Sequence, residues 1–137
     1  MIATICDWLR HRARLRRLSA DLAVGRRGED LAHRFLKRKG VVVVARNYRL
    51  GAGDAEADVI GWDGEELVFV EVKTRRSGEY GPPDRAVGEE KRAHLRRVAR
   101  EYTRKTGVGW ERVRFDVVNV ILAEPVQLEW LRGAFRD

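Results

Sequence analysis

Residues 55–74, AEADVIGWDGEELVFVEVKT, decide the fold of this chain, because they combine its most strand-like stretch with a group of charges set among apolar residues. Two apolar runs, 55–62 and 66–74, flank Asp63-Gly64, a dipeptide favoured in two-residue hairpin loops. We therefore predict an antiparallel β-hairpin. Successive side chains of a strand point to opposite faces, so Glu71 and Lys73 are expected on one face.

The register of this hairpin favours a metal site. If the dipeptide forms the whole loop, Asp58 lies opposite Phe69 and Glu56 lies opposite Glu71, and both acids share the face of Glu71 and Lys73. Like charges directly opposite are destabilising, so this register makes sense with a cation among the three acids. Carboxylates are hard ligands that suit Mg²⁺ or Mn²⁺. The alternative is a solvated strand surface, on which such charges are common.

The flanking segments extend the hairpin into an α/β fold. Residues 20–38 have a helical apolar period, in which Leu22, Glu29 and Leu36 are seven residues apart and share one buried stripe. Residues 41–48 form a β-branched run typical of a strand. A second helix is expected over residues 84–105 with Asp84 as its cap, and a further strand over 113–122, before a tail of uncertain structure. The predicted order is αβββαβ, a mixed sheet flanked by helices.

The second helix has two notable stripes. Lys91 is four residues from apolar positions on both sides, so it points along the apolar face, where it either reaches a substrate phosphate or only snorkels. Arginines at steps of four form what we expect to be an exposed basic ridge. They are Arg92, Arg96, Arg100 and Arg104.

Composition indicates one domain and a polyanionic partner. The 137 residues, 44% of them hydrophobic, are enough for one core, and a net charge of +7 favours nucleic acid. Residues 1–19 contain five arginines and one acid, so we expect a basic N-terminal arm followed by a single domain over 20–137. The arm is expected to bind phosphate, to lie on an anionic membrane, or only to solubilise the chain.

Other classes of protein are excluded by the same residues. A single cysteine, Cys6, precludes an intramolecular disulfide and, with three histidines, leaves no zinc-ligand spacing. No apolar run approaches the roughly 20 residues that span a bilayer, and residues 1–20 lack the apolar segment of a signal peptide. We therefore expect a cytoplasmic protein without stable membrane insertion.

Six blocks in order give a resemblance to a known family. The blocks are residues 25–29 (GRRGE), 46–49 (RNYR), 56–60 (EADVI), 69–75 (FVEVKTR), Lys91, and 114–118 (RFDVV). The chain resembles the YraN-like family, within the PD-(D/E)xK superfamily of restriction-endonuclease-like and Holliday-junction-resolvase-like folds. The resemblance covers residues 25–122. It departs from the usual pattern at Ala55 and Ala57, and neither change removes an acid.

The resemblance implies a restriction-endonuclease-like fold and a metal-dependent nuclease. By this resemblance Asp58 and Glu71 are catalytic metal ligands, Val72 offers its carbonyl, Lys73 is catalytic, and Glu29 is a candidate further ligand. Supporting roles are expected for Glu56, Lys91 and Asp116, although Asp116 could equally form a plain ion pair with Arg114. Nucleic-acid contacts are expected from Arg75, Arg76, Arg92, Arg96 and Arg100.

Two functions from different classes follow. The first is a Mg²⁺-dependent nuclease that hydrolyses phosphodiester bonds in DNA, including branched or junction DNA, for which a symmetric homodimer would suit the cutting of both strands. The second is a module of the same fold that binds nucleic acid or a protein without hydrolysis. The intact Asp58, Glu71 and Lys73 favour the nuclease, because a pure binder has little physical reason to keep three charges on the inward side of a sheet.

Overall fold

The computed structural model describes residues 2–51, 53, 55–77 and 87–136, with side chains from Ile5 onward. The chain forms α1 (Ile2–Arg38), β1 (Val42–Arg49), β2 (Glu56–Asp63), β3 (Glu66–Arg76), α2 (Glu89–Thr106), a 3₁₀ turn (Trp110–Arg112), β4 (Val113–Leu122) and β5 (Gln127–Phe135). The predicted αβββαβ order is confirmed. The tail of uncertain structure is a further strand, β5.

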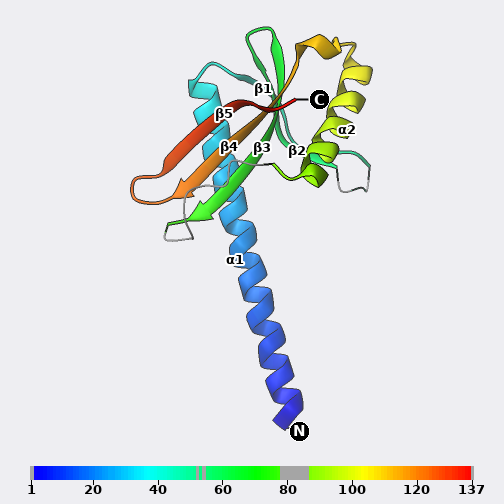
Figure 1. The fold of residues 1–137 in the computed structure, drawn as a ribbon. Coiled ribbons are helices and arrows are strands. Elements are labelled where there is room, and N and C mark those ends of the chain that lie inside the picture. The colour runs from blue at the N-terminus through cyan, green and yellow to red at the C-terminus, as the bar shows by residue number, and fades with distance from the viewer. Residues whose placement is uncertain (1, 52, 54, 78–86, 137) are drawn as a thin grey trace.

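The strands form one mixed sheet in the order β1-β2-β3-β4-β5 (Figure 1). Only β3 and β4 are parallel, and α2 lies in the connection between them, as parallel neighbours require. The pairs β1–β2, β2–β3 and β4–β5 are antiparallel. The α/β class with a mixed sheet and flanking helices is therefore confirmed.

Each face of the sheet buries its own apolar cluster. On one face Phe69 of β3 packs with Leu95 and Val98 of α2, and on the other Val70 packs with Leu36 of α1. The two helices thus lie on opposite faces (Figure 1). Alternation along β3 explains this division, because odd-numbered residues point toward α2 and even-numbered residues point toward α1. Glu71 and Lys73 belong to the odd series.

The predicted hairpin register is wrong by two residues. Asp63 pairs with Glu66 and Val59 pairs with Val70, so the loop is Gly64-Glu65 and not Asp63-Gly64. Gly64 takes a φ of +61°, a left-handed conformation that glycine adopts at little cost. Asp58, rather than Glu56, therefore lies one step beyond the last pair, beside Glu71.

Strand alternation also breaks at Asp58. Ala57 and Ile60 pack in the cluster under α2, whereas Val59 packs in the cluster under α1. On the neighbouring strand, Asn47 has a φ of +49°, which is uncommon for a residue other than glycine. The alternation from which we inferred a common face for Asp58 and Glu71 therefore does not hold at this point. Strand β2 instead directs the Asp58 carboxylate toward the backbone of β3 at Val72.

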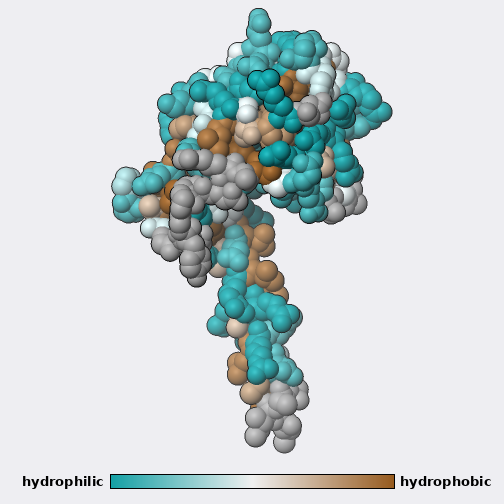
Figure 2. Space-filling model, in the orientation of Figure 1, coloured by the Kyte–Doolittle hydropathy of each residue, from teal (hydrophilic) through white to brown (hydrophobic). Residues whose placement is uncertain are grey.

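Helix α1 is continuous from Ile2, so the expected arm and the first helix are one element. Its N-terminal half extends away from the sheet, with apolar side chains among basic ones (Figures 1 and 2). Leu22, which we predicted on the buried stripe, is 63% exposed. No helix in the described part of the chain is long and apolar enough to cross a membrane. The division into an arm and one domain stays a prediction.

Gly28 lets the inner half of α1 approach the sheet closely. A Cβ atom at this position would lie 1.8 Å from the Thr74 Oγ1 atom of β3, so no larger residue fits without a shift. This contact sets α1 against the end of β3 that carries Glu71 and Lys73. Glu29, the next residue, is thereby brought to the same end of the sheet.

Helix α2 begins later than predicted. Its N-cap is Gly88, and the predicted cap Asp84 lies outside the described residues. The prediction of an exposed basic ridge is wrong for Arg92 and Arg96, because both side chains are half-buried. Their guanidinium groups lie 5.4 and 5.8 Å from the centre of the Phe135 ring. β5, which the sequence did not predict, supplies that ring.

Candidate functional site

Asp58 occupies the point where β2 and β3 separate. Its Oδ2 atom accepts a hydrogen bond from the backbone N–H of Val72 at 2.8 Å. The last paired residues of these strands are Val59 and Val70, so the carboxylate takes the place of the next backbone partner. The side chain is held mainly by β3, and this fixes one carboxylate oxygen while the other remains for a different ligand.

Glu71 lies beside Asp58 and is nearly buried. Its side chain is 12% exposed, and its Oε1 atom lies 3.6 Å from the Nζ atom of Lys91 on α2. Lys73 lies two residues further along the same strand face, near enough for its charge to lower the pKa of Glu71. Of the predicted supporting residues, Lys91 is thus brought to the acids, as an ion-pair partner of Glu71.

The two neighbouring carboxylates have strongly perturbed electrostatics. Burial raises the pKa of Asp58 to about 7, and the negative charge of Glu71 adds to this, against the opposing hydrogen bond from Val72. Burial also raises the pKa of Glu71, although Lys91 and then Lys73 oppose the shift. Such a pair is unfavourable when both groups are ionised, unless a cation lies between them.

Two further acids flank Asp58 and are joined by Asn47. With its amide nitrogen facing the carboxylates, Asn47 donates to Glu56 Oε1 and to Glu29 Oε2, both at 3.1 Å. Glu29 also lies 3.9 Å from the Arg46 guanidinium, and Glu56 lies 3.3 Å from that of Arg49. Both acids contribute to the raised pKa of Asp58 through their charge. Asn47 therefore connects α1 and β2 around the site.

An open cavity of about 590 Å³ gives access to Asp58 from the α1 side. Its lining residues are Leu18, Asp21, Leu22, Gly25, Arg26, Glu29, Asn47, Arg49, Glu56 and Asp58. An adjoining cavity of about 260 Å³ shares Asp21, Gly25 and Glu29 and reaches Val72, Thr74 and Arg76. The predicted ligands Asp58, Glu29 and Val72 thus line connected hollows beside α1.

The acids are not gathered into a closed set of ligands. Among the described residues, no group of three or more His, Cys, Asp or Glu side chains is arranged to hold a metal ion. The acids are kept apart by their other contacts, because Glu71 pairs with Lys91 while Glu29 and Glu56 accept hydrogen bonds from Asn47. Mg²⁺ usually takes only one or two carboxylates and keeps several waters, so Asp58 and Glu71 with a backbone carbonyl are sufficient ligands.

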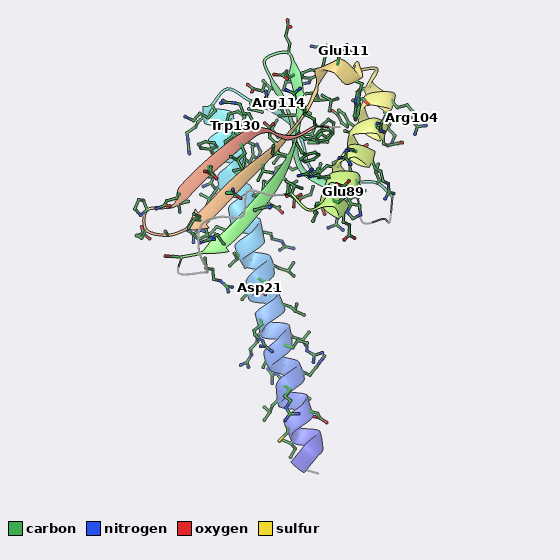
Figure 3. The ribbon with its side chains drawn as sticks, viewed as in Figure 1. Asp21, Glu89, Arg104, Glu111, Arg114 and Trp130 are labelled. Carbon is green, nitrogen blue, oxygen red and sulfur yellow. The ribbon has the colours of Figure 1, made fainter. Side chains whose placement is uncertain are left out.

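Asp116 is placed in a different network. It is fully buried and accepts hydrogen bonds from Arg114, from the Trp130 indole at 2.9 Å and from the Gly133 backbone at 2.9 Å. Two of these donors, Arg114 of β4 and Trp130 of β5, are labelled in Figure 3. It belongs to the α1-facing series of β4, whereas Glu71 belongs to the α2-facing series of β3. Asp116 therefore joins β4 to β5, and the ion pair is the interpretation that fits.

The predicted nucleic-acid contacts are distributed over two faces. Arg76 pairs with Asp21 of α1 at 3.3 Å, next to the smaller cavity, and Arg75 belongs to the opposite, α2-facing series. Arg100 places its guanidinium 4.5 Å from the centre of the Trp110 ring. Of the predicted arginines, Arg76 lines a cavity that also contains the predicted ligands Glu29 and Val72.

Two residues important for the site were missed. Asn47 carried a sequence signal, because Arg46-Asn47-Tyr48-Arg49 is one of the matched family blocks, and asparagine tolerates a positive φ better than most residues. Gly28 lay in another matched block, where a glycine inside a helical period indicates a close packing contact. Neither residue has a chemistry that singles it out as a ligand.

Comparisons with known proteins give the family of the chain. The model of the Uncharacterised protein family UPF0102 matches residues 28–120. A UPF0102 protein of Solibacter usitatus is 57% identical over 122 residues, which cover 89% of this chain and 92% of the relative. One of Rhodococcus jostii is 45% identical over 120 residues, covering 86% and 100%. The chain therefore belongs to the UPF0102 family, which is the YraN family that its sequence resembles.

Proposed function

We propose that this protein is a Mg²⁺-dependent nuclease of the PD-(D/E)xK type that hydrolyses phosphodiester bonds in DNA. The observation that carries the proposal is the position of the Asp58 carboxylate, which inserts between β2 and β3 beside Glu71 and within 2.8 Å of the Val72 nitrogen. Lys73 follows on the same strand face as Glu71. Two acids and a lysine are thus concentrated where β2 and β3 separate.

The electrostatics of the acids fit a divalent cation. Burial raises the pKa of both Asp58 and Glu71, and the charge of Glu71 raises that of Asp58 further, so a positive charge between them would relieve a repulsion that the described protein groups only partly offset. A Mg²⁺ ion held by Asp58, Glu71 and the Val72 carbonyl would lower the pKa of a bound water and neutralise charge on the scissile phosphate. Mn²⁺ has similar ligand preferences and is expected to substitute.

The protein groups around this ion have distinct roles in the proposal. Lys73 orients the attacking water or helps to deprotonate it. Lys91 pairs with Glu71 and would be available to a substrate phosphate if Glu71 held the ion. Asn47 keeps Glu29 and Glu56 apart from Asp58 and available as acceptors for metal-bound waters.

The second candidate function is nucleic-acid or protein binding without hydrolysis. It is favoured by the ion pairs that the acids already form, Glu71 with Lys91 and Glu29 with Arg46. A protein that had lost catalysis would retain these pairs as structural contacts. It would bind DNA with a strong salt dependence, because phosphate contacts release counterions.

One set of assays separates the two functions. Purified protein is incubated with branched, flapped, single-stranded and duplex DNA in Mg²⁺ or Mn²⁺, and the variants Asp58→Ala and Lys73→Ala are tested in parallel. Matched controls are Asp7→Ala and Lys105→Ala, which alter exposed residues paired elsewhere with Arg10 and Glu101. The nuclease requires cleavage that both site variants lose and both controls keep.

The opposite outcome supports the binding module. Cleavage that persists in the site variants would come from a contaminant, and no cleavage by any preparation would reject the nuclease. DNA binding that survives Lys73→Ala, together with no heat of Mg²⁺ binding in calorimetry, would establish the second function instead.

A further inference from the structure

The larger cavity beside Asp58 has an apolar wall that a metal site alone does not need. Leu18 and Leu22 lie one helical turn apart on α1, so their side chains form one continuous surface. They are 53% and 63% exposed, although each lines the cavity together with Asp58. Two large apolar side chains left this accessible beside buried acids indicate a flat apolar group as the ligand that covers them.

Two arginines at the same cavity provide cationic groups for a phosphate, beside the four acids Asp21, Glu29, Glu56 and Asp58 that also line it. Arg26 follows Leu22 by four residues on α1, and Arg49 enters from β1. Arg49 uses its Nε atom for Glu56 at 3.3 Å, and its side chain remains 66% exposed. A guanidinium has five N–H donors, so Arg49 can bind a phosphate while it keeps this contact. The cavity thus combines an apolar wall, cationic groups and the proposed metal ligands.

These features match one nucleotide better than a duplex. A volume of about 590 Å³ lies within the range of sites for small ligands. A paired base has its faces covered by neighbouring base pairs and its edge by its partner, so it cannot lie against Leu18 and Leu22. An unpaired base can do so while its phosphate contacts Arg26 or Arg49 and the next phosphate reaches the metal ion proposed at Asp58.

We propose that this cavity binds one unpaired nucleotide, with its base on Leu18 and Leu22, so that the substrate is a single strand or the unpaired region of a branched DNA. The assignment rests on the proposed function, since it places the strand relative to the metal ligands. It deepens that function by naming the DNA class that the site selects.

The test measures binding separately from cleavage. Fluorescence anisotropy with a labelled thymidine oligonucleotide and with the duplex formed by its complement is recorded in EDTA, where metal-dependent hydrolysis is absent. The variant is Leu18→Ala/Leu22→Ala in the full chain. Its control is Leu9→Ala/Leu15→Ala, which truncates two leucines of similar exposure on the same helix that do not line the cavity. Circular dichroism verifies that both variants keep their helix content.

The proposal predicts a selective effect. The Leu18→Ala/Leu22→Ala variant should bind the single strand about tenfold more weakly with duplex binding unchanged, and the control should bind both like the wild type. An equal loss in the two variants, an equal loss for duplex and single strand, or no single-strand binding by the wild type would overturn it. Selective single-strand binding without cleavage in Mg²⁺ would reject the nuclease and leave the cavity assignment intact.

Discussion

The substitution Asp58→Asn is predicted to stabilise the metal-free protein at neutral and alkaline pH. The amide has nearly the same shape, and its oxygen can still accept the 2.8 Å hydrogen bond from the Val72 nitrogen. What the variant loses is a buried negative charge beside Glu71. Removal of this charge should therefore increase the free energy of unfolding, because burial and the charge of Glu71 make the ionised carboxylate unfavourable in the metal-free protein.

The magnitude follows from the pKa of Asp58. Folding raises that pKa from an ordinary 3.8 to about 7, and each unit corresponds to about 1.4 kcal/mol. Below about pH 4 the carboxyl group is protonated in both states and has no such cost. As the pH rises from 4 to 7, the Asp58 carboxyl group ionises first in the unfolded chain, so the free energy of unfolding of the wild type falls by up to about 4 kcal/mol. Above pH 7 this decrease is constant. The variant has no titrating group at this position.

Urea unfolding in EDTA at a series of pH values between 4 and 8.5 measures the effect. The difference in unfolding free energy between Asp58→Asn and wild type should grow from near zero at pH 4 to a few kcal/mol at pH 8. Mg²⁺ should then stabilise the wild type at pH 8, by about 2.7 kcal/mol at a hundredfold excess over its dissociation constant, and leave the variant unchanged. An Asp58→Asn protein that is no more stable than wild type at pH 8 would refute the reasoning.

Three further changes test the surrounding structure. Gly28→Ala should destabilise the fold by about 2 kcal/mol in urea unfolding, because its Cβ atom would overlap Thr74. Gly25→Ala has nothing within 4 Å of its Cβ atom and should be neutral or stabilising, so equal effects of the two substitutions would contradict the close packing. Asp116→Asn should cost about 3 kcal/mol, since it leaves Arg114 without the carboxylate that raises its pKa, and an unchanged melting temperature would dismiss this network. Lys91→Ala should raise the pKa of Glu71 further, detected by NMR titration of the metal-free protein, and no shift would show that the ion pair is not formed in solution.

The sequence predicts the order of elements well, because the hydrophobic period differs clearly between residues 20–38 and the strands that follow. It could not predict β5, since residues 127–135 alternate weakly and depend on pairing with β4. The length of α1 was missed for a related reason. Its outer half has no buried partner in the described structure, so no packing stripe separates it from an arm.

The closeness of Asp58 and Glu71 was predicted from the sequence and its geometry only in part, while the roles of the candidate site residues stay predictions. The register error of two residues exchanges Glu56 for Asp58 beside Glu71, and the break in alternation at Asp58 removes the common face from which its position was inferred. The break in alternation at Asp58, opposite the left-handed backbone of Asn47, is a property of the folded sheet that no local pattern indicates. The pairing of Lys91 with Glu71 depends on how α2 packs, which no local pattern encodes.

The most direct measurement for the metal site is a crystal structure of the protein soaked in Mn²⁺, with the ion located by its anomalous scattering. The proposal predicts an ion about 2.0–2.2 Å from oxygens of Asp58 and Glu71 and from the Val72 carbonyl, with Glu71 turned away from Lys91. A structure at saturating Mn²⁺ in which Glu71 remains paired with Lys91 and no ion lies beside Asp58 would contradict the proposal.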